Sequence, residues 1–290
     1  LDAQAKNTHI HLGNTDGKID RIMIIDDGSG MDRYTLIESY RFSTDIAHTQ
    51  GDLGKYGLGG TTGCFTLAAC KHTLTKTKGG DLFYAIQDLS VSTGVKLGLA
   101  TKEQRGFFNE YCKNESGTII ILTQVKELDY KTAGRLKNKI VSEFRETFYS
   151  YINQNRNIYV SVGDNKPIKI GAKDPLLFNQ PELLEWSHKK DITYNGQMIS
   201  LRMCIVKTNM LSEDGSKSYQ KQGVYLNRNG RLIHRGGSLK NVWKIHPAYN
   251  TARIEVYFGE ESDFDFGLKA TKNGVAIKQG LADTLTEEVN

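Results

Sequence analysis

Apolar and polar residues alternate along the first part of the chain in the pattern of a β-hairpin. The alternation runs from Thr8 to Leu12, stops at the polar turn "GNTDGK" and returns in "IDRIMIID". Two alternating runs on either side of a short polar turn are typical of paired antiparallel strands. Asp26 and Asp27 are therefore expected at the C-terminal end of the second strand.

The middle of the chain predicts a buried strand, one long helix and a further strand. Residues 117–125, "GTIIILTQV", are almost continuously apolar, and residues 157–164 read "NIYVSVGD". Between them, apolar residues recur at helical spacing and would form one face of a single helix that ends near Asn155. The residues of this face are Leu136, Ile140, Val141, Phe144, Phe148 and Ile152.

A polar connector that contains two prolines precedes a second group of predicted strands. The connector "KDPLLFNQP" covers residues 173–181, and the strand patterns after it are "QMISLRMCIV", "GVYLNRNGRLIH" and "ARIEVYF". With 290 residues, of which 38% are hydrophobic and 24% charged, the chain has the composition of a globular protein. We therefore expect two domains, residues 1–172 and residues 173–290.

Charge and cysteine content narrow the classes of function only slightly. The net charge of +5 is compatible with an anionic partner but does not establish a nucleic-acid-binding protein. The four cysteines are scattered without a CxxC pair, so neither a zinc site nor a disulfide framework is indicated, and a reducing compartment is favoured. No apolar run approaches 18 residues, so no membrane partner is expected. We expect a cytoplasmic protein, with a nucleoid-associated or nuclear location as the alternative.

Two glycine-containing motifs are candidates for ligand binding. "DDGSG" follows the second strand, and "GDLGKYGLGGTTGCFTLAAC" has six glycines between positions 51 and 63 before its pattern turns helical. Glycines let a backbone approach a ligand closely, and free N–H groups at a helix start favour phosphate. A flexible surface loop explains the glycines alone equally well. For Asp26, the alternative to ligand binding is that it caps the helix predicted to start near Asp32.

The order and spacing of these motifs resemble those of the GHKL ATPases, the superfamily of DNA gyrase B subunits, histidine kinases, ninety-kilodalton heat-shock chaperones and MutL proteins. "DDGSG" looks like the adenine-binding D-x-G-x-G motif, "GKYGLG" like the phosphate-lid motif, and the pair Gly117-Thr118 like the short motif of the next strand. Within the superfamily, "GKYGLGGTTGCFTLA" and "GVYLNRNGRLI" most resemble MORC-type ATPases and their bacterial relatives.

The resemblance implies an α/β protein of the α+β sandwich type. The first domain would be a Bergerat-type ATP-binding domain, with helices on a mixed, mostly antiparallel sheet, and the second an α/β transducer-like domain with a ribosomal S5-like fold. Asp26 would accept a hydrogen bond from the adenine amino group. The implied ATP-binding residues are Asp26, Gly28, Gly30, Met31, Lys55, Tyr56, Gly57, Leu58, Gly59, Gly60, Thr61, Thr62 and Thr118.

The chain departs from the family pattern at two points. The first family motif carries a glutamate that activates the attacking water and an asparagine that binds Mg²⁺, and the resemblance implies that both lie upstream of Leu1. This chain would then supply no metal ligand of its own, although ATP and Mg²⁺ are the expected cofactors. Thr61 stands where the closest bacterial patterns have a lysine, so lid contacts to phosphate would rely on backbone N–H groups and on Lys55.

The resemblance further implies an ATPase that forms a homodimer when nucleotide orders the lid. Its function would be that of a clamp or motor in DNA transactions or in bacterial defence against phage, with DNA and an effector protein or C-terminal domain as further partners. A nucleotide-sensing scaffold without hydrolysis and a chaperone-like ATPase are the alternatives. The cluster Arg228, Arg231, His234 and Arg235 is interpreted as solvated hairpin surface, with a DNA-phosphate contact as the sharper alternative.

One lysine of the second domain is expected to sense the γ-phosphate. In "FDFGLKATKNGVAIK" a short loop holds Lys269 and Lys272, where related transducer domains place a lysine that reaches the ATP site. The spacing of Lys272 from "SDFDF" matches the family better, so Lys272 is preferred and Lys269 is the alternative. Solvated surface lysine is the competing interpretation for either residue.

Overall fold

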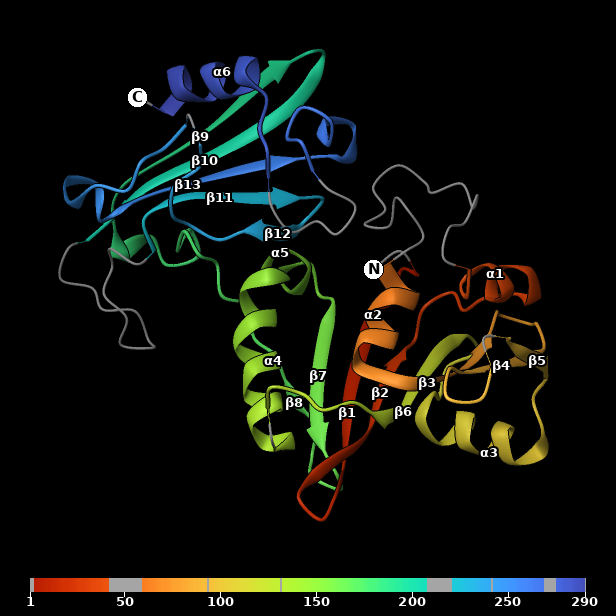
Figure 1. The fold of residues 1–290 in the computed structure, drawn as a ribbon. Coiled ribbons are helices and arrows are strands. Elements are labelled where there is room, and N and C mark those ends of the chain that lie inside the picture. Colours follow the sequence, from red (N-terminus) through yellow and green to blue (C-terminus); the bar gives the residue numbers. More distant parts are fainter. Residues whose placement is uncertain are drawn as a thin grey trace. The chain divides into compact units, whose positions relative to one another are not determined.

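The computed structural model describes residues 3–41, 59–92, 94–130, 132–207, 221–240, 242–268 and 275–289. These residues form two compact units (Figure 1). The first unit takes in most of the chain up to Gly171, and the second comprises Ala172–Asn290 together with the short segment Glu146–Tyr151. No helix in the described part of the chain has the length and apolar character needed to cross a membrane.

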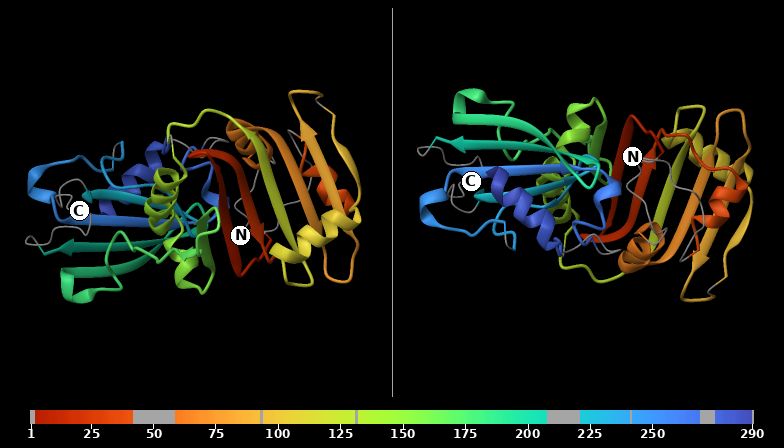
Figure 2. Two further views of the ribbon diagram at one scale, coloured as in Figure 1. Left: turned by 90° about the horizontal axis from the view of Figure 1, so that it is seen from below. Right: turned by 90° about the horizontal axis from the view of Figure 1, so that it is seen from above.

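The first unit is built on an eight-stranded mixed sheet whose strand order is β5-β4-β3-β6-β2-β1-β7-β8 (Figure 2). Its β1–β7 pair is parallel, and all its other pairs are antiparallel. The predicted hairpin is confirmed, because β1 and β2 pair around the turn that "GNTDGK" provides. The strands are β1 (Asn7–Thr15), β2 (Lys18–Asp26), β3 (Ala68–Lys76), β4 (Leu82–Asp88), β5 (Lys96–Leu99), β6 (Gly117–Val125), β7 (Asn157–Val162) and β8 (Ile168–Lys169).

Helices cover both faces of this sheet. Successive apolar residues of β2 point to opposite faces, so both faces must be covered. Ile22 belongs to a core that includes residues of α2 and α4, whereas its neighbour Met23 belongs to a second core with Phe108 of α3. The helices are α1 (Arg33–Glu38), α2 (Gly59–Leu67), α3 (Lys102–Tyr111), α4 (Ala133–Thr147) and α5 (Tyr149–Asn153). The predicted class, α+β with a mixed and mostly antiparallel sheet, is confirmed.

The long helix predicted up to Asn155 is in fact two helices, and the break lies at Phe148. Ile140 and Phe144 pack on the core of the first unit as expected, but Tyr149 and Tyr151 are buried within the second unit. Aromatic residues have lower helix propensity than the Leu, Lys and Glu of α4. Side-chain packing at residues 149 and 151 therefore outweighs continuation of one regular helix.

The second unit is a five-stranded sheet of order β12-β11-β13-β10-β9, in which β11 and β13 are parallel. The three strand patterns quoted after the connector each form strands as predicted. The elements are β9 (Leu184–Tyr194), β10 (Gln197–Val206), β11 (Gly223–Arg228), β12 (Arg231–His234), β13 (Ala252–Phe258), α6 (Gln279–Val289) and the 3₁₀ helices η1 (Pro181–Leu183), η3 (Pro247–Tyr249) and η4 (Glu260–Ser262).

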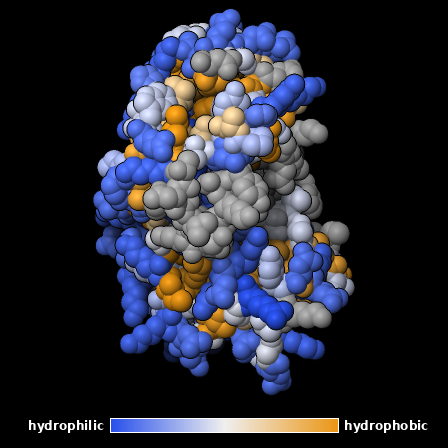
Figure 3. Space-filling view, turned by 90° about the vertical axis from the view of Figure 1, so that its left-hand side faces the viewer, coloured by the Kyte–Doolittle hydropathy of each residue, from blue (hydrophilic) through white to orange (hydrophobic). Residues whose placement is uncertain are grey.

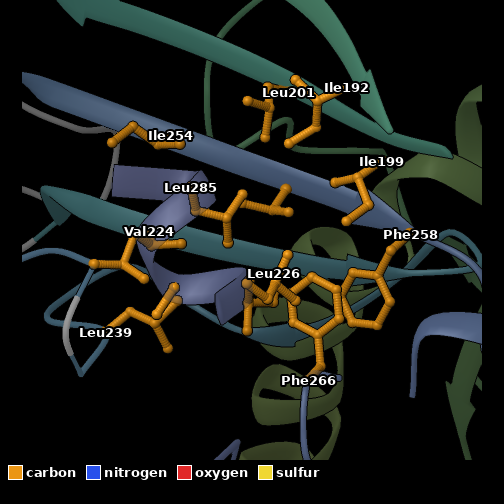
Figure 4. Packing of buried hydrophobic residues seen from close by; sticks show 14 of the residues in the cluster. Ile192, Ile199, Leu201, Val224, Leu226, Leu239, Ile254, Phe258, Phe266 and Leu285 are labelled. Carbon is orange, nitrogen blue, oxygen red and sulfur yellow. The ribbon is translucent and has the colours of Figure 1, made fainter. Parts of the chain in front are cut away.

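One face of the second sheet packs on α6. Figure 4 shows Leu285 among side chains of the strands, including Leu226 and Ile254, and the rings of Phe258 and Phe266 lie parallel with centroids 3.6 Å apart. Burial of such side chains contributes about 1.5–3 kcal/mol each to folding. This apolar face therefore accounts for much of the stability of the second unit.

The opposite face of the same sheet buries a charged network. Arg202 Nε donates to Glu255 at 2.5 Å, and Arg202 Nη1 donates to Asp174 at 2.9 Å. Tyr149 O–H donates to the other oxygen of Glu255 at 2.5 Å, and the Asn227 amide donates to that oxygen at 3.0 Å. Burial lowers the pKa of Arg202, but the two carboxylates more than offset this and raise it overall. The network fixes the segment that carries Tyr149 to the second sheet.

The interpretation of the Arg228 cluster as exposed basic surface is wrong for its first member. Arg228 is 1% exposed, and its Nε donates to Asp263 at 2.6 Å. Arg231 and His234 are half-buried, and the Arg235 guanidinium donates to the Thr147 hydroxyl. Arg228 therefore stabilises the fold through a buried ion pair and cannot contact DNA phosphate.

We expect Arg228→Met to destabilise the second unit by about 3–5 kcal/mol, because Asp263 is left as a buried charge without its partner. Both tryptophans, Trp186 and Trp243, lie in this unit, so guanidinium unfolding followed by tryptophan fluorescence reports on it. The control is Lys190→Met in the Lys190–Glu288 pair on the surface of the same unit, for which a change of about 1 kcal/mol or less is expected. A loss below about 1 kcal/mol in Arg228→Met would show that the pair does not stabilise the fold.

Candidate functional site

The Asp26 carboxylate lies where β2 ends and the turn to α1 begins, as the sequence predicts. Its Oδ1 accepts a hydrogen bond from the Gly28 N–H at 2.9 Å. Among the described residues no donor reaches Oδ2. Burial raises the pKa of Asp26, and the Gly28 hydrogen bond lowers it by a smaller amount. Asp26 is therefore a mostly buried acceptor that is only half satisfied by the protein.

The glycines of the motif are required by close contacts within the chain itself. A Cβ on Gly28 would lie 2.5 Å from the Ala3 carbonyl oxygen, and a Cβ on Gly30 would lie 2.0 Å from the Lys76 carbonyl oxygen. Gly30 also has a φ of +68°, which L side chains rarely adopt. Gly117 has its own close approach, because a Cβ there would lie 2.4 Å from the Asp26 carbonyl oxygen. Backbone thus packs against backbone on three sides of Asp26.

A buried hydroxyl pair connects three of the predicted residues. Thr118 is the cross-strand neighbour of Asp26 on β6, and its hydroxyl lies 3.1 Å from that of Thr75 on β3. The Thr75 hydroxyl also accepts from the Met31 N–H at 2.8 Å and lies 3.2 Å from the Gly117 carbonyl oxygen. The sequence analysis did not predict Thr75. The feature that could have identified it is the polar residue at every second position of β3, Lys71, Thr73 and Thr75, on the face of the strand that does not face α3.

Two further aspartates close to Asp26 in the sequence, Asp27 and Asp32, have structural roles. Asp27 accepts from the Lys6 N–H at 2.8 Å and from the Asn7 N–H at 2.8 Å, which holds the start of β1. Asp32 is the N-cap of α1 and accepts from the Thr35 N–H at 2.7 Å. The alternative that Asp26 caps this helix is therefore wrong. Asp32 is exposed, so water can complete its partners, whereas Asp26 is mostly buried and accepts from one described donor.

The predicted lid residues are described only in part. The glycine loop leads into a helix as expected, since α2 begins at Gly59 and includes Gly60 and Thr62. Thr61 is fully buried, and its hydroxyl donates to the Ser39 carbonyl oxygen at 2.7 Å. Its backbone, rather than its side chain, remains for ligand contact. The remaining predicted residues Lys55, Tyr56, Gly57, Leu58, Lys269 and Lys272 lie outside the described residues.

A buried lysine lies on the same face of β3 as Thr75. Lys71 is 3% exposed, its Nζ lies 4.0 Å from the centre of the Tyr40 ring, and it donates to the Ser39 carbonyl oxygen at 3.5 Å. No carboxylate among the described residues pairs with it, and burial lowers its pKa. Sequence reasoning missed Lys71 because a lysine inside a strand is normally exposed.

These groups suit an adenine base better than they suit a metal ion. The free Asp26 oxygen can accept from an exocyclic amino group, and the Thr118 hydroxyl beside it can donate or accept. Within the described ranges no three His, Cys, Asp or Glu side chains come close enough to hold a metal ion.

The Asp26 turn and the hydroxyl pair lie together on the mixed sheet of an α+β unit. Residues 1–118 match the family model described as histidine kinase-, DNA gyrase B-, and HSP90-like ATPase. The match begins before the hairpin and ends at Thr118, so it spans the Asp26 turn and the hydroxyl pair. It supports a GHKL-type ATPase domain and, with it, ATP binding. A search of curated proteins found no match.

We expect Gly30→Ala to destabilise the first unit by about 2–4 kcal/mol, because it adds a steric clash to an unfavourable φ. Gly79→Ala is the matched control, since Gly79 has a φ of +70° but no atom within 4 Å of an added Cβ. For Gly79→Ala the free energy of unfolding should fall only by the cost of a side chain in the left-handed conformation, about 1–2 kcal/mol. Hydrogen exchange of the β2 and β3 amides measures both. Equal losses in the two variants would show that the contact with Lys76 is not tight.

Proposed function

We propose that the first unit binds ATP, with the adenine amino group donating to the free oxygen of Asp26. The observation that carries the proposal is this carboxylate, held by one amide at the end of a buried strand and flanked by Thr118. A buried polar group without a partner is unfavourable, and the adenine amino group would satisfy it. The family match across residues 1–118 supports the same ligand.

The proposal extends to hydrolysis, which GHKL-type domains generally perform. Mg²⁺ is the expected metal cofactor, and it would supply positive charge at the phosphates. The first turn of α2, from Gly59, leaves backbone N–H groups free, which suits phosphate. ATP would order that loop and favour a closed homodimer, while ADP would favour the open form. We place the protein among MORC-type ATPases that act as clamps in DNA transactions or bacterial defence, with the second unit as transducer.

Steady-state hydrolysis by the full-length protein, measured with and without DNA, tests this extension. Turnover that DNA stimulates supports the clamp, and turnover that DNA leaves unchanged supports an ATPase without the DNA role. ATP binding without turnover would overturn the hydrolytic part of the proposal and leave a nucleotide sensor.

Asp26→Asn should weaken ADP and ATP binding about 30- to 1000-fold, because an amide donor then faces the adenine amino group. Isothermal titration calorimetry measures the loss, and circular dichroism checks that the variant is folded. The matched control is Asp32→Asn, since asparagine is as good an N-cap as aspartate and affinity should not change. Unchanged affinity in folded Asp26→Asn would remove this residue from the site.

Lys272→Ala should lower the rate of ATP hydrolysis and nucleotide-driven dimerisation while ADP affinity stays nearly constant. The reason is that an ammonium group neutralises charge at the γ-phosphate, which ADP lacks. Lys269→Ala is the matched comparison, since Lys269 is three positions away in the sequence. Equal weakening of ADP and ATP binding, or an effect of Lys269→Ala alone, contradicts the assignment of Lys272.

A further inference from the structure

A cavity lies on the α3 side of the first sheet, on the face opposite Asp26. Its volume is about 430 Å³, within the range of small-molecule sites. Ile121 and Phe107 line it and belong to the α3 core, whereas Ile120, on the same face of β6 as Thr118, belongs to the other core. A ligand here would not compete for space with a nucleotide at Asp26.

The walls of this cavity are mainly apolar and come from both the sheet and the helix. Tyr84 on β4, Ile121 on β6, and Leu74 on β3 form the floor, and Phe107 of α3 forms part of the opposite wall. Two of these side chains, Tyr84 and Phe107, are aromatic. Leu74 is buried, and the other three are partly exposed. The shape and the walls suit a flat apolar body between sheet and helix.

Arg21 provides a positive charge on the wall. Its Nε is buried, and no acceptor among the described residues bonds to it. Two other polar groups of the lining are engaged, because Gln104 forms the capping box with Thr101 and His72 Nε2 lies 3.1 Å from the Cys70 sulfur. The guanidinium as a whole forms no hydrogen bond or ion pair with a described residue, so an anionic group in the cavity would give its charge a partner.

Glu103 places a negative charge at the rim of the cavity, away from the positive charge of Arg21. This residue lies in the first turn of α3, lines the cavity and is exposed. Its negative charge disfavours an anion near that part of the rim, whereas Arg21 attracts one from β2. A bound acid would therefore point its anionic group at Arg21 and its ring toward Phe107 and Tyr84.

We propose that this cavity is a binding site for a small aromatic acid. The carboxylate would accept from the Arg21 guanidinium, and the ring system would occupy the space bounded by Phe107, Tyr84 and Ile121. This inference is independent of nucleotide binding, since the two sites share strands but use opposite faces of the sheet.

Naphthoate is the probe, and its neutral amide is the comparison ligand. Calorimetry on the full chain should show one naphthoate site, with about tenfold or more weaker binding of the amide. Saturating ADP should not displace the acid. Methyl NMR should show shifts at Ile121 and Ile86, which line the cavity, and none at Ile22, which packs on the other face.

Arg21→Met should abolish the preference for acid over amide, because it keeps an apolar stem and removes the charge. Lys18→Met is the matched control, since Lys18 lies on the same strand, is exposed and does not line the cavity. The proposal is overturned by absence of naphthoate binding at millimolar concentration, by shifts confined to other residues, by displacement with ADP, or by an unchanged acid preference in folded Arg21→Met.

Discussion

Close packing of backbone against backbone around Asp26 is the constraint on which the candidate site depends. The turn after β2 contacts Ala3 on one side and the end of β3 on another, while the start of β6 contacts Asp26 itself. Side chains at Gly28, Gly30 or Gly117 would separate these segments. The carboxylate is thus positioned by three strands together, which gives it a fixed location before any ligand arrives.

This packing changes the reason for the glycines in the motif. The sequence interpretation assigned Gly28 and Gly30 to close approach of the base, whereas their contacts within the chain already require them. The two reasons are compatible, because a turn without side chains leaves one side of its backbone open. A ligand that uses this open side benefits from a shape that folding has already established.

The strands of both units could be predicted because their signals are local. The bounds of β6, β10 and β13 agree with the quoted patterns, since alternation or continuous apolar character and flanking polar residues define each strand. The break at Phe148 and the burial of Arg228 could not be predicted in this way. Each depends on a partner distant in sequence, Glu255 for Tyr149 and Asp263 for Arg228.

The same distinction applies to the site. Asp26, Gly28, Gly30 and Thr118 could be found because they lie in short motifs. Thr75 could not, because its role comes from hydrogen bonds to residues 44 and 43 positions away along the chain. A threonine in a strand has the same local pattern whether it packs, faces solvent or joins a polar network.

The charged network of the second sheet has a consequence for how this protein can change during evolution. Arg202 bonds to Asp174, Glu255 and Tyr149. These four residues come from four separate parts of the chain. Loss of any one group leaves the others with unmatched buried charge or donors. Effects of substitutions at these positions are therefore non-additive. Related sequences should exchange them as a set, and covariation among the four positions should be strong.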